Sequence, residues 1–82
     1  MKTKTKTKSL EILRANDLYP DGVKITVDWA DMVVGASIFI PCIDTTKAKE
    51  QLKAVFRGKK WEYNADIRVE SGILGVRVWR TL

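Results

Sequence analysis

The chain has 82 residues, 45% of them hydrophobic, and a formal net charge of +5. A chain of this length forms a single small domain that buries roughly 60% of its unfolded surface. Because it contains one cysteine and no histidine, it has no intrachain disulfide, no His/Cys zinc site and no Ser-His or Cys-His nucleophile pair. A lysine- or carboxylate-based enzyme stays possible, but no motif indicates one, and we expect a non-enzymatic protein without a metal or another cofactor.

The positive charge is concentrated at the N-terminus. Residues 1–8 alternate lysine with threonine and contain no acid, whereas the remaining residues hold eleven basic and ten acidic side chains, a net charge of +1. Closely spaced like charges without apolar residues predict a disordered tail over residues 1–8, followed by one domain over residues 9–82. The apolar run from Met32 to Ile43 is too short and interrupted to cross a bilayer, and no secretory signal is visible. We therefore expect a soluble, intracellular protein with no membrane partner.

The first half of the chain, up to Pro41, predicts two strands joined to a loop. Residues 9–15 fit either a helical turn or a strand, and residues 16–22 contain the loop signal Pro20-Asp21-Gly22. Residues 23–29 alternate apolar and polar side chains and predict a half-buried strand. A second strand is predicted over residues 36–40, and Pro41 either ends its pairing or places it at a sheet edge.

A helix is predicted after this strand. Asp44, Thr45 and Thr46 offer oxygens for an N-cap, and Gly58 suits the position that follows a helix. Apolar residues recur between these ends at helical spacing and form one stripe: Ala48, Leu52, Val55 and Phe56.

Two strands complete the chain. Residues 61–70 alternate apolar and polar side chains, Ser71-Gly72 is a turn signal, and residues 73–80 predict the last strand. In that strand Gly75 suggests a bulge or a close backbone approach. Leu74, Val76 and Val78 are expected on one face, and Arg77 and Trp79 on the other. The predicted order is β-β-α-β-β, a small α+β domain with an antiparallel-rich sheet packed on one amphipathic helix.

Three segments of the chain form a recognisable combination: Trp-Ala-Asp-Met-Val-Val-Gly-Ala-Ser-Ile-Phe-Ile-Pro at residues 29–41, Arg-Gly-Lys-Lys at 57–60, and Gly-Val-Arg-Val-Trp-Arg at 75–80. In their order and spacing they resemble a group of small, mostly uncharacterised proteins of tailed bacteriophages and prophages. The resemblance covers residues 27 to 82, and this chain departs from the pattern at Ile38, where an aromatic residue is common. It implies a phage origin and a small α+β domain. With the expectation of a soluble, intracellular protein, the expected location is the host cytoplasm. The resemblance supplies no catalytic residues.

Two groups of side chains are candidates for contact with nucleic acid. Each tail lysine that neutralises a phosphate releases counterions and adds a salt-dependent contribution to affinity; alternatively, the tail only improves solubility. These lysines are Lys2, Lys4, Lys6 and Lys8. In the last strands an exposed tryptophan beside guanidinium groups would stack on a base; alternatively, Trp79 is covered and belongs to the core. This group consists of Arg68, Arg77, Trp79 and Arg80.

A third group lies at the expected end of the helix. Arg57, Lys59 and Lys60 either extend a phosphate-binding rim or simply complement the negative end of the helix dipole.

Three functions remain open at the level of sequence. The leading hypothesis is a small phage accessory protein that binds DNA or RNA without catalysis. The alternative is a protein-interaction module that inhibits or redirects a host enzyme or defence protein, and a weaker reading is sequestration of a small anionic nucleotide between protomers. Because a small sheet with an exposed edge tends to pair with itself, we expect a homodimer.

Overall fold

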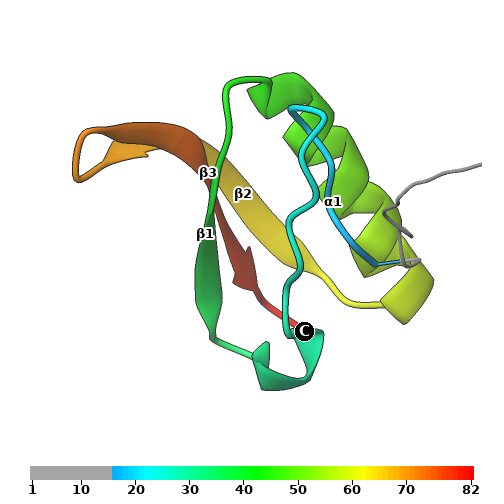
Figure 1. The fold of residues 1–82 in the computed structure, drawn as a ribbon. Helices are drawn as coiled ribbons and strands as arrows, with labels where there is room; N and C mark the ends of the chain where they lie inside the picture. Colours follow the sequence, from blue (N-terminus) through cyan, green and yellow to red (C-terminus); the bar gives the residue numbers. More distant parts are fainter. Residues whose placement is uncertain (1–15) are drawn as a thin grey trace, which may run out of the picture.

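The fold is one helix packed against a three-stranded antiparallel sheet (Figure 1). A computed structural model describes residues 16–82, so the predicted tail and residues 9–15 lie outside the described residues. The elements in chain order are a 3₁₀ helix η1 (Trp29–Asp31), β1 (Ser37–Pro41), α1 (Thr45–Lys59), β2 (Tyr63–Glu70) and β3 (Ile73–Arg80). The predicted α+β class is therefore confirmed.

The last strand in the chain is the central strand of the sheet. The strand order is β1-β3-β2, and both neighbours run antiparallel to β3. The turn between β2 and β3 consists of Ser71 and Gly72, which both have positive φ angles, as the preferred two-residue hairpin turn requires. Pro41 ends β1 at a sheet edge, as predicted.

Helix α1 begins as the sequence indicates and ends later. The Asp44 carboxylate accepts a hydrogen bond from the backbone N–H of Lys47 at 2.9 Å, which makes Asp44 the N-cap. Gly58, expected just beyond the helix, lies within it, and Lys60 adopts the left-handed conformation instead. Helical continuation through Gly58 brings the ring of Trp61 to 5.7 Å from that of Phe56, centroid to centroid, and this contact favours the later end.

The core lies between α1 and the sheet, and residues 16–32 contribute to it. The predicted apolar stripe of α1 is buried, and Phe56 at its centre is fully enclosed. Its ring contacts the rings of Trp29, Trp61 and Tyr63. The complete set of buried hydrophobic residues among those described is Leu18, Trp29, Met32, Ile40, Cys42, Ala48, Leu52, Val55, Phe56, Val76 and Val78.

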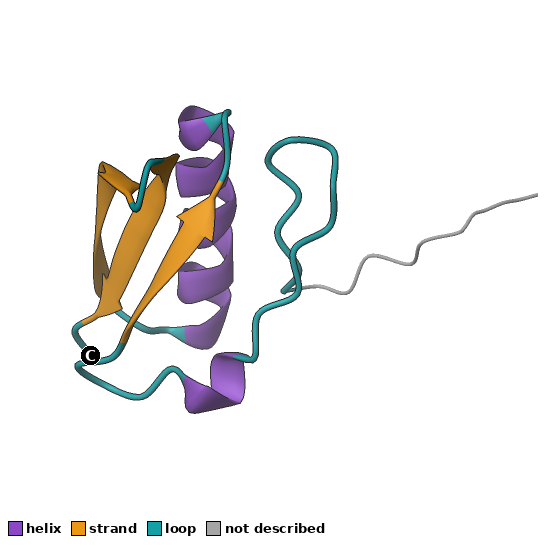
Figure 2. Cartoon of the chain, turned by 60° about the vertical axis from the view of Figure 1, so that its left-hand side comes forward, coloured by secondary structure: helices purple, strands orange, loops and turns teal. Residues whose placement is uncertain are grey.

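The predicted strand over residues 23–29 is wrong. Only an isolated bridge joins Leu18 to Ile25, and Trp29 begins η1. This part of the chain runs as a loop beside α1 (Figure 2), where the backbone N–H of Tyr19 donates to Gln51 Oε1 of the helix at 2.6 Å. Alternating apolar residues fit any extended segment with one side against a core, so the pattern does not require a partner strand.

Candidate functional site: an arginine and tryptophan sheet face

The candidate site is the face of the sheet that α1 does not cover. Because side chains alternate along a strand, Val76 and Val78 of β3 point to the helix, and Arg77 and Trp79 point away from it. The pairing register places Phe39 of β1 opposite Arg77, on the same face. No described element lies against this face in Figures 1 and 2.

Guanidinium groups lie over aromatic rings on this surface. The guanidinium carbon of Arg68 is 5.6 Å from the ring centroid of Trp79, and that of Arg77 is 5.7 Å from the ring centroid of Phe39. Both distances are within the range of cation–π attraction. The structure therefore brings Arg68, Arg77 and Trp79 together as the sequence predicted and adds Phe39. We call these four residues the Arg/Trp face.

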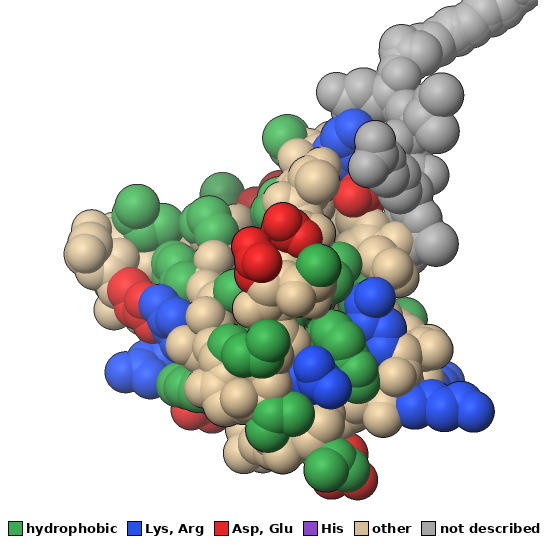
Figure 3. Space-filling model, turned by 90° about the horizontal axis from the view of Figure 1, so that it is seen from below, with side chains coloured by type: hydrophobic (Ala, Val, Ile, Leu, Met, Phe, Trp, Pro, Cys, Tyr) green, Lys and Arg blue, Asp and Glu red, His purple; other side chains and the backbone are tan. Residues whose placement is uncertain are grey.

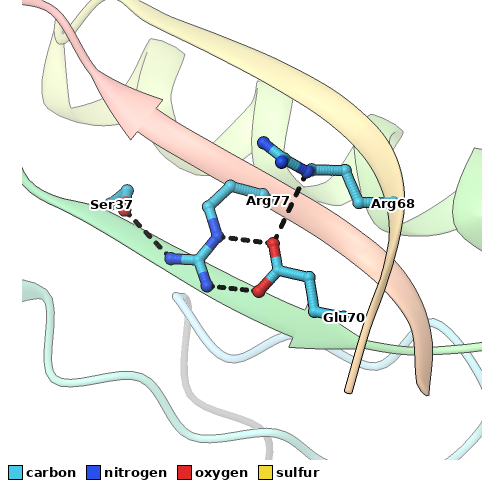
Figure 4. Close-up of polar contacts among 4 residues, drawn as sticks. All are labelled: Ser37, Arg68, Glu70 and Arg77. Carbon is cyan, nitrogen blue, oxygen red and sulfur yellow. Dashed lines mark hydrogen bonds and ion pairs between the residues drawn. The ribbon is translucent and has the colours of Figure 1, made fainter. Parts of the chain in front are cut away.

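A glutamate that sequence reasoning missed holds the two arginines (Figure 4). Arg77 donates through Nε to Glu70 Oε2 at 2.9 Å and through Nη2 to Oε1 at 2.5 Å. Arg77 Nη1 donates to Ser37 Oγ at 2.9 Å, and Arg68 Nε lies 3.6 Å from Glu70 Oε2. Glu70 lies two residues from Arg68 on one strand, so alternation alone could have placed both on one face.

This ion pair lowers the pKa of Glu70. The main cause is the side-chain hydrogen bond from Arg77, to which the positive charges of Arg77 and Arg68 add, while partial desolvation acts in the opposite direction. The carboxylate form is thus favoured in the folded protein, and Arg77 is held in a fixed orientation against Ser37.

The Glu70 interaction should make stability depend on pH. Because its pKa is lowered on folding, the carboxylate stabilises the folded state above the ordinary glutamate pKa, and this contribution disappears as the pH falls through the lowered folded pKa. Glu70→Gln should therefore be less stable than the wild type at pH 7, with a difference that shrinks on acidification. Urea unfolding at several pH values measures this, with Glu62→Gln as the control outside the ion pair. A gap that stays constant down to acid pH contradicts the expectation.

Arg80 does not belong to the Arg/Trp face, so that part of the prediction is wrong. Adjacent residues of a strand point to opposite faces, and Arg80 therefore lies on the side of the sheet opposite Trp79. Its guanidinium carbon is 3.7 Å from the ring centroid of Trp61. Its Nη1 donates to the carbonyl of Met32 at 2.9 Å and its Nε to that of Leu82 at 2.9 Å. The bond to Met32 ties the C-terminal strand to the segment before β1.

Arg80 instead joins the basic cluster predicted at the end of α1. Lys59 Nζ lies 5.1 Å from the Trp61 ring, and Arg57 and Lys60 are exposed nearby in the chain. We call this cluster the basic helix end; it comprises Arg57, Lys59, Lys60, Trp61 and Arg80. Figure 3 shows that Lys and Arg side chains on the lower side of the molecule are spread out and separated by other atoms.

Other kinds of site find no support within residues 16–82. No pocket forms among these residues, and none of their His, Cys, Asp and Glu side chains cluster in a way that could hold a metal ion. The Cys42 thiol is buried, and its pKa is raised by burial and by the charges of Asp21 and Asp44. Among the described residues, the one α-helix is not of the length and apolarity that a membrane span needs.

Comparison with known proteins gives no match: no protein-family model, no curated protein and no solved structure matches this chain.

Proposed function

We propose that this protein is a small, non-catalytic nucleic-acid-binding protein. Because of the sequence resemblance described above, we further propose that it is a phage accessory protein. The observation that supports this proposal is the place of Trp79. It lies half-buried on the central strand of a sheet face that α1 leaves uncovered, under the guanidinium group of Arg68. Aromatic side chains on the central strands of an open sheet are one of the ways in which proteins stack unpaired bases.

The proposal assigns stacking and phosphate attraction to different residues. On the sheet face, Arg68 and Arg77 are balanced by Asp66 and Glu70, so this face attracts phosphate only weakly. The basic helix end and the four lysines of the N-terminal segment supply the additional positive charge. Such an arrangement favours single-stranded DNA or RNA, whose bases are accessible, with little sequence preference and strong salt dependence.

Within the face the two arginines have different roles. The Arg68 side chain is 49% exposed and has one long contact with Glu70, so it can move aside and place a base between itself and Trp79. Arg77 makes three hydrogen bonds to Glu70 and Ser37 and stays in place. We therefore assign Arg68 to ligand contact and Arg77 to positioning of the surface.

The test is a fluorescence anisotropy titration with labelled single-stranded oligonucleotides of DNA and RNA. Binding should be detectable at about 50 mM salt and weaken steeply by about 200 mM. Trp79→Ala should weaken it about fivefold to a hundredfold, as expected for the loss of one stacking contact, and Trp79→Phe should restore most of it. Ile43→Ala is the control, because this apolar side chain is 82% exposed but follows Pro41, at the end of β1 opposite to Ser37, which pairs with Trp79.

Two results of this titration argue against the proposal in different ways. No binding of either polymer at about 50 mM salt overturns it altogether, since phosphate contacts are strongest there. Unchanged affinity of Trp79→Ala with a steep salt dependence removes the sheet face from the interface and leaves only the lysine-rich segment and the basic helix end.

The near neutrality of the Arg/Trp face favours a second candidate, a module that binds a host protein. Tryptophan and arginine are enriched in the centres of protein interfaces, whereas unbalanced charge is depleted there. In the titration above, this candidate predicts no nucleic-acid binding. A complex with a host enzyme or defence protein that survives high salt and is lost in Trp79→Ala would then support it.

A further inference from the structure

We propose that two copies of this chain pair antiparallel along β2, with the two-fold axis at Ile67, and so form one continuous six-stranded sheet. The inference starts from the sheet order β1-β3-β2, which makes β2 an edge strand. Its residues, Tyr63–Glu70, include neither proline nor glycine. Among the residues that the structure describes, no strand pairs with its outer side. An edge of this kind is a template for pairing with another chain.

The backbone of β2 has the right groups at this edge. Thr81 N–H donates to the carbonyl of Glu62 at 2.8 Å, and bonding residues alternate along an antiparallel pair. The even-numbered residues of β2 therefore bond to β3. The odd-numbered residues direct their N–H and C=O groups to the outer side; they are Tyr63, Ala65, Ile67 and Val69.

The opposite edge of the sheet is protected. Strand β1 is shorter, and Cys42 N–H donates to the carbonyl of Leu74 at 3.1 Å just after it ends. By the same alternation Pro41 faces the outer edge of β1, where it offers no N–H. The two edges therefore differ, and β2 is the one suited to pairing.

The charges of β2 favour the register centred on Ile67. When Ile67 faces the partner's Ile67, Asp66 faces the partner's Arg68, and the symmetry repeats this attractive pair. A register centred on Asp66 would place two carboxylates opposite each other, and one centred on Arg68 would oppose two guanidinium groups. A register centred on Val69 would pair Arg68 with Glu70, but it would include only residues 68–70. Opposite charges across a strand pair stabilise it, and like charges destabilise it.

The apolar side chains of β2 also favour a second copy of this chain as the partner. The β2–β3 hairpin projects beyond α1 (Figure 1), and Ile67 and Val69 on its helix side are 53% and 66% exposed. In the proposed register Ile67 packs against the partner's Ile67, and Val69 against the partner's Ala65. A second copy thus supplies apolar contacts, ladder hydrogen bonds and opposite charges at once.

The test is the mass of the full chain by size-exclusion chromatography with light scattering, together with sedimentation to obtain the dimer Kd. The wild type should have twice the 9.3 kDa mass of one chain. Asp66→Arg and Arg68→Asp should each raise the dimer Kd at least about tenfold, because two attractive pairs become repulsive. An equimolar mixture of these two variants should recover dimerisation as a heterodimer, since each Arg then faces an Asp. Glu62 lies outside the residues that pair in the proposed dimer. Glu62→Arg makes the same change of charge as Asp66→Arg and should therefore dimerise like the wild type.

Three results overturn the proposal. One is a wild-type protein that stays monomeric at every concentration up to about 1 mM, because a dimer Kd above this value is too weak for a specific dimer. Another is unchanged dimerisation of Asp66→Arg and Arg68→Asp, which would place the interface elsewhere. The third is two single variants that stay monomeric on mixing while far-ultraviolet circular dichroism shows both to be folded. None of these results depends on nucleic-acid binding.

Discussion

Replacing Gly75 by alanine should destabilise the domain by about 1–3 kcal/mol or more, because the added methyl group has no space. A Cβ at this position would meet the backbone carbonyl oxygen of Ile40, and would lie 2.7 Å from Cζ of Phe39 and 2.9 Å from Cα of Pro41. The Phe39 ring could turn away, but the β1 backbone could not move without breaking its pairing with β3. Urea unfolding at fixed protein concentration measures the loss, since self-association makes apparent stability depend on concentration.

Gly58→Ala is the matched control for this change. Gly58 lies inside α1 without a positive φ angle, and a Cβ there meets nothing within 4 Å. Alanine should therefore stabilise the helix by about 0.5–1 kcal/mol. If Gly75→Ala is tolerated as well as Gly58→Ala, then β1 does not approach β3 as closely as described, and the sequence inference of a close backbone approach at Gly75 fails too.

Local patterns predicted the second half of the fold well. The N-cap at Asp44, the stripe around Phe56 and the strand over residues 73–80 all depend on side chains within a few residues of one another. Such features follow from periodicity and capping, which a single sequence displays directly. The strand predicted over residues 23–29 failed because whether an extended segment pairs with a sheet or packs on a helix depends on distant residues.

The candidate site was predictable only where alternation sufficed. Arg77 and Trp79 lie two residues apart in one strand, and Arg68 faces the same side in the paired strand. The contact of Arg80 with Trp61 depends on where α1 ends, and the helix runs past the glycine that suggested an earlier end. Strict use of alternation would nonetheless have separated Arg80 from Trp79, since neighbouring residues of a strand cannot share a face.

The register of the hairpin explains why Glu70 was missed. The bond from Arg77 to Glu70 joins two residues seven positions apart and diagonal across β2 and β3, where Glu70 is paired with Ile73 and Arg77 with Asp66. From the sequence, Asp66 is as good a partner for Arg77 as Glu70 is. The choice matters for function, because it leaves Asp66 to meet the partner's Arg68 in the proposed dimer.

The core should depend most heavily on one side chain, Phe56. It is fully buried, and its ring centroid lies 5.5 Å from that of Trp29, 5.7 Å from that of Trp61 and 4.6 Å from that of Tyr63. Phe56→Ala should lower the free energy of unfolding by about 3–5 kcal/mol. Small domains have only about 5–15 kcal/mol in total, so much of the stability would be lost.

Tryptophan fluorescence during urea unfolding measures this effect, because Trp29 and Trp61 both contact the Phe56 ring. Lys53→Ala, on the exposed side of the same helix, should change the unfolding midpoint little. The consequence extends to the basic helix end. The ring of Phe56 contacts the ring of Trp61, and the guanidinium group of Arg80 lies over that same Trp61 ring. A Phe56→Ala protein that unfolds at the wild-type urea concentration would show that the aromatic cluster does not hold α1 to the sheet.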